Sequence, residues 1–179
     1  YEYFVKKSDR EEAYRLTTKL AGLYNKDGKH KLEIQTFRFI LSKDPDNLNA
    51  PDYQANIVQA YSTLGDREAV RRAVRRMVEL YRPGGPWARK NEGNETAVER
   101  ARTLAENKMR QLVTEYHEYA QKFKKVSDYT LARDIYKEYL QAFPDSDDAY
   151  NLSFYYAEIL WDLDQWRLAA AQYDRVVKK

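Results

Sequence analysis

A step of 37 residues occurs twice in this chain of 179 residues, and it constrains the fold more than any other feature. The step separates Gly28 from Gly65 and Ser127 from Asp164, and a phenylalanine, tyrosine or valine follows each of these four positions by nine residues. A period in this range is typical of stacked structural repeats. Repeat proteins of this kind usually present a surface that holds a partner, so we expect a binding protein before an enzyme.

Apolar residues recur at spacings of three and four with no clean alternation at a spacing of two, so the sequence predicts helices and no strands. The expected helices cover residues 10–26, 29–43, 51–64, 66–81, 95–126, 128–142, 147–163 and 165–178. Short polar residues can accept hydrogen bonds from the first N–H groups of a helix. The expected caps are Ser8, Asp9, Asp66 and Asp128.

Four units aligned on Gly28, Gly65, Ser127 and Asp164 share further positions. Seven residues before the turn stand Ala21, Val58, Ala120 and Ala157. Four before it stand Tyr24, Tyr61, Phe123 and Leu160, which are large and apolar. Nine after it come Phe37, Val74, Tyr136 and Tyr173, and twelve after it come Ile40, Met77, Tyr139 and Val176. Five residues after the turn come Glu33, Val70, Ala132 and Ala169, so the first unit has a glutamate where the other units have a valine or an alanine. These positions are the predicted core.

This pattern resembles the tetratricopeptide repeat, a helix-turn-helix of about 34 residues. Ala132, Tyr136 and Pro144 match the family's second-helix alanine, aromatic residue and closing proline, and Gly28 with Pro45 matches the turn and the end of the first unit. The family's tryptophan near the start of each unit is absent throughout. The resemblance implies an all-α fold, a right-handed α-solenoid of about four such repeats with one long central helix.

The expected organisation is an N-terminal pair of repeats over residues 1–82, a loop over 83–94, and a long helix with a C-terminal pair over 95–179. The loop carries Pro83-Gly84-Gly85-Pro86, and the helix after it has one broad apolar face. We expect one continuous array, with two independent domains as the alternative. The chain begins at Tyr1-Glu2-Tyr3-Phe4 and ends at Val176-Val177-Lys178-Lys179 without a polar capping helix, which predicts a fragment of a longer array or one capped by a partner.

Composition argues against several function classes. A net charge of +3, from 31 basic and 28 acidic residues, gives no general case for nucleic acid, whose binding depends on neutralising many phosphates. The chain has no cysteine and two histidines, and the string around His117 lacks the paired histidines of a helical zinc site. We interpret His30 as a solvated turn residue. The sequence predicts no enzyme activity, no cofactor, no metal site and no small-molecule substrate.

A partner-binding groove is expected on the first helices of the last two units, where the resembled family lines its concave surface. Aromatic residues with a polar edge are favoured anchors of interfaces. The expected site residues are Trp161, Phe154, Tyr150, Glu158, Asp162, His117, Gln121, Lys124 and Lys125. We expect a protein or peptide partner, with the two lysines selecting its charge. The alternative for the aromatic residues is burial against a neighbouring helix or a missing continuation of the array.

Two other functions stay open. Arg71, Arg72, Arg75 and Arg76 form a basic cluster that could bind nucleic acid or an anionic surface, although a solvated outer face with Glu68 and Glu79 nearby is the interpretation we favour. Exposed ends of the array could also stack between copies and make a self-assembling structural module.

The segments Tyr136-Lys137-Glu138-Tyr139-Leu140 and Phe143-Pro144-Asp145-Ser146 look similar to those of bacterial cell-envelope members of the family. These members include outer-membrane assembly lipoproteins, the coordinator of the Tol–Pal system and repeat proteins of myxobacterial gliding machines. The resemblance implies a periplasmic or outer-membrane-associated protein, with the cytoplasm as the alternative. No segment is long and apolar enough to cross a bilayer, so a membrane would be reached only through an absent anchor or a partner.

Overall fold

The computed structural model describes residues 10–177, and the expected caps Ser8 and Asp9 and both chain ends lie outside this range. Over the described residues the chain is helical and contains no strand, which confirms the all-α fold class. Two compact units divide it, residues 1–105 and 106–179. The boundary falls inside one long helix.

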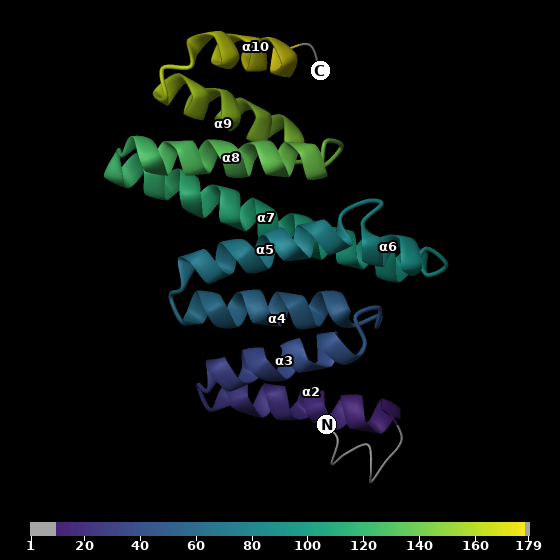
Figure 1. Cartoon of the computed structure of the whole chain (residues 1–179). Helices are drawn as coiled ribbons and strands as arrows, with labels where there is room; N and C mark the ends of the chain where they lie inside the picture. The colour runs from purple at the N-terminus through teal and green to yellow at the C-terminus, as the bar shows by residue number, and fades with distance from the viewer. Residues whose placement is uncertain (1–9, 178–179) are drawn as a thin grey trace. The chain divides into compact units, whose positions relative to one another are not determined.

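Unit 1 consists of two helical hairpins followed by a short helix. The hairpins are α2 (Arg10–Lys26) with α3 (His30–Lys43) and α4 (Ala50–Thr63) with α5 (Arg67–Tyr81). Each helix contacts the next, as Figure 1 shows for the purple to blue part of the chain. The short helix α6 (Pro86–Lys90) and the beginning of α7 (Glu95–Phe123) complete the unit.

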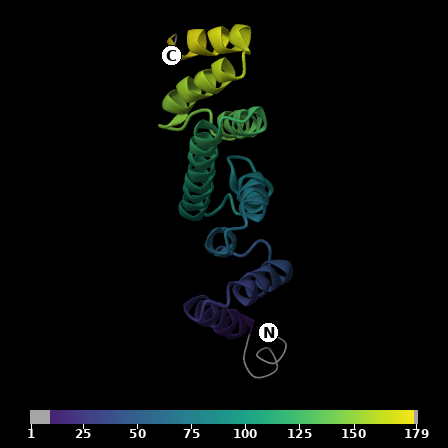
Figure 2. The ribbon, with the colours of Figure 1, turned by 90° about the vertical axis from the view of Figure 1, so that its left-hand side faces the viewer.

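Unit 2 contains the end of α7, then α8 (Val126–Ala142), α9 (Ala149–Asp162) and α10 (Trp166–Val177). α9 contacts both α8 and α10. Figure 2 shows α7 as a single helix without a break. Eight helices were expected, and each of them is present within a few residues of its expected bounds. Helix-turn-helix repeats of the tetratricopeptide kind therefore fit each unit, whereas a continuous right-handed array stays a prediction.

Most of the aligned repeat positions form the core. The assignment to the core was wrong for Tyr24, Tyr61, Val70 and Tyr173, which are only half-buried. The alanines at the position seven before the turn, Ala21, Ala120 and Ala157, are fully buried, and Val58, which holds the same position in the second repeat, is also buried. At the position twelve after the turn, Ile40, Met77, Tyr139 and Val176 are all buried. Small residues on one helix and large residues on the next let paired helices approach closely, which explains why these positions repeat. Phe123 departs from this pattern because α7 ends at that residue, and its side chain is 45% exposed.

The turns share one backbone device. Gly28, Gly65 and Asp164 have positive φ angles of 69°, 70° and 57°, and each stands two residues before its second helix. The N–H of the following residue donates a hydrogen bond to a carbonyl near the end of the preceding helix. The Lys29 N–H, for example, donates to the carbonyl oxygen of Tyr24 at 2.8 Å. This hydrogen bond satisfies a carbonyl that the end of a helix leaves without a partner.

The expected third turn was misplaced. Lys124, with a φ of 52°, is the positive-φ residue there, and Ser127 already lies in α8. Asp128 therefore caps nothing, and one of its carboxylate oxygens is buried without a hydrogen-bond partner. The cap expected at Asp66 is confirmed, because its side chain accepts a hydrogen bond of 2.9 Å from the Ala69 N–H.

A buried polar cluster explains the departure of the first unit from the repeat. Glu33 occupies the alanine position, is 3% exposed, and accepts hydrogen bonds of 3.0 and 3.1 Å from the Asn25 side-chain amide. His30 Nδ1 lies 3.0 Å from the same carboxylate, and its side chain is only 16% exposed. The interpretation of His30 as a solvated residue was wrong, because the histidine serves as a partner for a buried charge.

The segment between the repeat pairs is anchored to unit 1 rather than being only a loop. Its helix α6 places Trp87, 2% exposed, edge-on to Tyr81 with ring centroids 5.4 Å apart. The indole N–H of Trp87 donates a hydrogen bond of 3.1 Å to the carbonyl oxygen of Asn47. An ion pair of 2.6 Å between Lys90 and Asp46 makes a second connection to the turn between α3 and α4.

Candidate functional site

Helix α9 places four of the expected site residues along one side. Tyr150, Phe154, Glu158 and Trp161 follow one another at spacings of four, four and three, which keeps them on one helical stripe. Trp161 is 60% exposed, Tyr150 53% and Phe154 41%, while Glu158 is half-buried. We call these four residues the α9 aromatic surface. Several large rings exposed together on one helix are uncommon away from binding surfaces.

Rings of α10 extend this surface. Phe154 packs on Tyr173 with ring centroids 5.5 Å apart in a T-shaped arrangement. Trp161 and Trp166 lie with their ring centroids 6.3 Å apart, and Trp166 is 58% exposed. Sequence reasoning assigned Tyr173 to the core and gave Trp166 no role. Trp166 stands two residues after the turn at Asp164, which places it beside the end of α9. This closeness in the sequence could have indicated its contact with Trp161.

His117 lies under the surface rather than on it. Its side chain is buried in α7, and its ring contacts Tyr136 of α8 and Tyr155 of α9 edge-on, with centroids 5.6 and 6.0 Å away. Burial lowers the pKa of His117 below its ordinary value of 6.5, although the charges of Asp162 and Glu118 act in the opposite direction. A neutral His117 therefore supports the neighbouring rings and offers a partner little exposed area.

The remaining predicted residues lie around the ends of α7 and α9. Gln121, Lys124 and Lys125 are exposed at the end of α7 and in the turn that follows, and Asp162 is exposed at the end of α9. Within residues 10–177 no hydrogen bond or ion pair joins the side chains at the end of α7 to the α9 aromatic surface. Their participation in one site stays a prediction.

Carboxylates give this part of unit 2 a negative field. Burial is the largest cause of the raised pKa of Tyr173, and the charges of Glu158 and Asp162 add to it. The pKa of Tyr129 is raised by burial and then by Asp162. These two carboxylates are therefore close enough to act on phenols of both α8 and α10. A partner that covers the aromatic rings would meet this negative charge at their edge.

The arginine cluster of α5 is engaged by carboxylates on its own helix. Arg71 and Arg72 lie 2.6 and 3.9 Å from Glu68, and Arg76 lies 2.9 Å from Glu79. Pairs at spacings of three and four are ordinary features of an exposed helix face. Glu68 and Glu79 therefore lie beside the cluster as expected, and Arg72 and Arg76 are exposed, whereas the Arg71 side chain is only 21% exposed.

A hollow in unit 1 has a volume of about 790 Å³, and none of the predicted site residues lines it. Helices α2 and α4 and the turn before α4 line it. Thr18 and Tyr53 meet in its wall, with their hydroxyl oxygens 3.2 Å apart. Over residues 10–177 no three His, Asp or Glu side chains are arranged to hold a metal ion. No helix in the same range is long and apolar enough to cross a membrane.

Comparison with known proteins gives limited information. No protein-family model and no curated protein matches the chain. Among solved structures it is similar to a candidate kinesin light chain of Podosopora anserina with nearly identical TPR-like repeats, at 11% identity and a TM-score of 0.33 over 96% of each chain. A point variant of that protein gives the same identity and TM-score over 92% of each chain. Likeness at this level carries no argument about function, and it gives no support to the envelope group. The architecture therefore rests on the helices and contacts described above.

Proposed function

We propose that this chain is a non-enzymatic scaffold that binds a segment of a partner protein on the α9 aromatic surface. The observation that carries the proposal is the exposure of Trp161, Tyr150 and Phe154 along one side of a helix whose other side is buried. A partner that covers these rings gains the free energy of burying a large aromatic area. The helical scaffold is already ordered, so the protein side loses little conformational freedom on binding.

Charge around the rings defines the partner further. Glu158 and Asp162 favour basic groups at the rim nearest α10, while Lys124 and Lys125 favour acidic groups at the end of α7. The proposed partner segment is therefore amphipathic, with apolar residues over Phe154 and Trp161. Either an extended strand or a helix could present such residues.

The two other candidate functions have less support. Glu68 and Glu79 compensate part of the positive charge of the α5 arginines, which reduces what a polyanion could neutralise there. Self-assembly would need apolar residues exposed on α10, yet Val176 of that helix is 5% exposed. A role in a bacterial envelope is proposed on the sequence resemblance alone.

A capture experiment tests the proposed function. Immobilised chain, Trp161→Ala and Phe154→Ala are each mixed with a lysate of the source cells, and retained proteins are identified by mass spectrometry. Leu23→Ala is the matched control, because Leu23 is 57% exposed on α2 in the other unit. We expect specific partners to be lost with both aromatic variants and kept with the control. Equal retention by all four proteins would contradict the proposal.

A further inference from the structure

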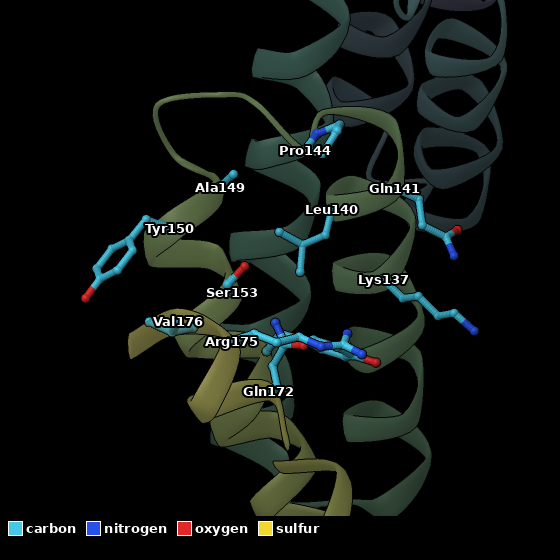
Figure 3. A pocket seen from close by; sticks show the side chains of 11 residues that line it. Lys137, Leu140, Gln141, Pro144, Ala149, Tyr150, Ser153, Gln172, Arg175 and Val176 are labelled. Atoms are coloured by element: carbon cyan, nitrogen blue, oxygen red, sulfur yellow. The ribbon is translucent and has the colours of Figure 1, made fainter. Parts of the chain in front are cut away.

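Unit 2 contains a hollow between α8, α9 and α10, and Trp161 does not line it. Its volume is about 340 Å³, which lies within the range of small-ligand sites. Figure 3 shows Arg175 and Gln172 of α10 below Ser153 of α9, with Lys137 of α8 extending outward at the edge. The rest of the lining includes the apolar side chains of Leu140, Pro144 and Val176, together with Gln141 and two tyrosines.

The lining contains two cations and no carboxylate. Lys137 and Arg175 are exposed, and over residues 10–177 neither forms an ion pair. Gln172, 8% exposed, contributes a side-chain amide, and Ser153 contributes a hydroxyl. Each of these four groups carries an N–H or O–H that can donate a hydrogen bond. The lining is therefore complementary to a negative charge that has an apolar group beside it.

The repeat provides an independent comparison, because unit 1 has a hollow of about 230 Å³ at the equivalent place. Aligning the repeat positions of the sequence matches Lys137 with Arg38, since each directly follows the buried aromatic residue of its unit, Tyr136 or Phe37. Arg175 matches Arg76 in the same alignment, eleven residues after the turn. Arg38 and Arg76 both line the hollow of unit 1. Two cations at matching positions thus belong to the repeat, and they are not an accident of one helix.

The two hollows differ in how their cations are compensated. In unit 1 the Arg38 guanidinium lies 5.6 Å from the centroid of the Tyr61 ring, and Arg76 pairs with Glu79 at 2.9 Å. The sequence has Leu160 where unit 1 has Tyr61, and Lys178 where unit 1 has Glu79. Unit 2 has therefore lost both compensating groups while keeping the two cations. An external anion would replace them.

We propose that the unit 2 hollow binds the side-chain carboxylate of a glutamate or aspartate in a partner protein. Arg175 offers a planar pair of N–H groups to both carboxylate oxygens, and Lys137 adds a mobile positive charge. A leucine-sized neighbour of the acidic residue packs against Leu140, Pro144 and Val176. The proposal rests on the proposed function only in taking a protein segment as the occupant. Tyr150 borders both this hollow and the α9 aromatic surface, so one segment can reach both.

The test uses short peptides, so it does not depend on finding the partner. The whole chain, labelled with ¹⁵N, is titrated with acetyl-Gly-Leu-Glu-Leu-Gly-amide and with the same peptide carrying glutamine. We expect the glutamate peptide to shift the Gln172 side-chain amide and the Arg175 Nε–H resonances, and to bind about tenfold more tightly than the glutamine peptide. Because the attraction is ionic, raising the salt from about 0.05 M to about 0.5 M weakens it.

Variants locate the binding. Arg175→Gln and Lys137→Gln should each lower the affinity for the glutamate peptide by at least about fivefold. Arg167 is exposed on α10, as Arg175 is, and Arg167→Gln should leave this affinity unchanged. No shift at Gln172, equal affinity for both peptides, or an equal loss with Arg167→Gln overturns the proposal. Inorganic phosphate that binds these residues as tightly as the peptide would also overturn it and indicate a general anion site. Trp161→Ala should leave the peptide affinity unchanged, so this test and the capture experiment can fail separately.

Discussion

The phenol oxygen of Tyr136 lies 2.5 Å from Nδ1 of His117, and this hydrogen bond joins α8 to α7 beneath the α9 aromatic surface. Both side chains are buried, and burial raises the pKa of Tyr136 while it lowers the pKa of His117. The pair is therefore held in its neutral form. A buried neutral histidine in this position makes the packing of unit 2 sensitive to protonation.

Stability should fall as the solution becomes acidic because of His117. Its pKa in the folded chain is below the ordinary value of 6.5, so the unfolded chain binds the proton more readily. The stabilisation is fully present above pH 6.5 and is lost as the pH falls through the folded pKa. Urea unfolding between neutral and mildly acidic pH should show a steeper decline for the natural chain than for His117→Gln. Parallel curves for the natural chain and His117→Gln would contradict the assignment.

Replacing a turn glycine by alanine should lower the free energy of unfolding, whereas the same replacement of a glycine within a helix should raise it. Gly28 and Gly65 have positive φ angles, so alanine at either position is strained and should lower the free energy of unfolding by about 1 kcal/mol. Gly22 lies within α2 with open space around it, and alanine there should raise that free energy by about 0.5–1 kcal/mol. Thermal denaturation measures all three variants. Destabilisation by Gly22→Ala, or no effect of Gly28→Ala, would be inconsistent with the described turns.

Two tryptophans should differ sharply in their effect on stability. Trp87→Ala removes a fully buried ring and its hydrogen bond to Asn47, which should cost about 3–5 kcal/mol. Trp166→Ala removes a ring that is 58% exposed and should cost less than about 1 kcal/mol. Chemical denaturation of both variants measures the difference. Similar losses for the two variants would show that Trp87 does not anchor the segment between the repeat pairs.

The sequence predicted the core of the fold because the repeat encodes it directly. Apolar residues at matching positions had to face a neighbouring helix, and Phe37, Val74 and Tyr136 are buried as expected, whereas Tyr173 of the last unit is only half-buried. The third turn was missed because Lys124 adopts a conformation that usually favours glycine, so its residue type gave no signal. The core assignment of Tyr136 survived because α8 only begins two residues earlier than expected, so Tyr136 stays within the same helix.

Tertiary contacts explain what the sequence did not predict. Glu33 departs from the repeat, and only the structure shows that Asn25 and His30 are the hydrogen-bond partners of its carboxylate. The exposure of Trp161 follows from helical spacing and was predicted, whereas the ring contact with Trp166 depends on how α10 folds back on α9. The hollow beside Arg175 also needs three helices together, so no local pattern indicates it.

Photo-crosslinking from position 161 tests the central claim most directly. Trp161 is replaced by a benzophenone-bearing amino acid in the whole chain, and the same residue at Leu23 provides the control at a comparably exposed site. The account predicts that position 161 crosslinks to a defined segment of a partner protein with apolar residues, and that position 23 does not. Crosslinks from position 161 that are absent, or the same as those from position 23, would contradict a binding role for the α9 aromatic surface.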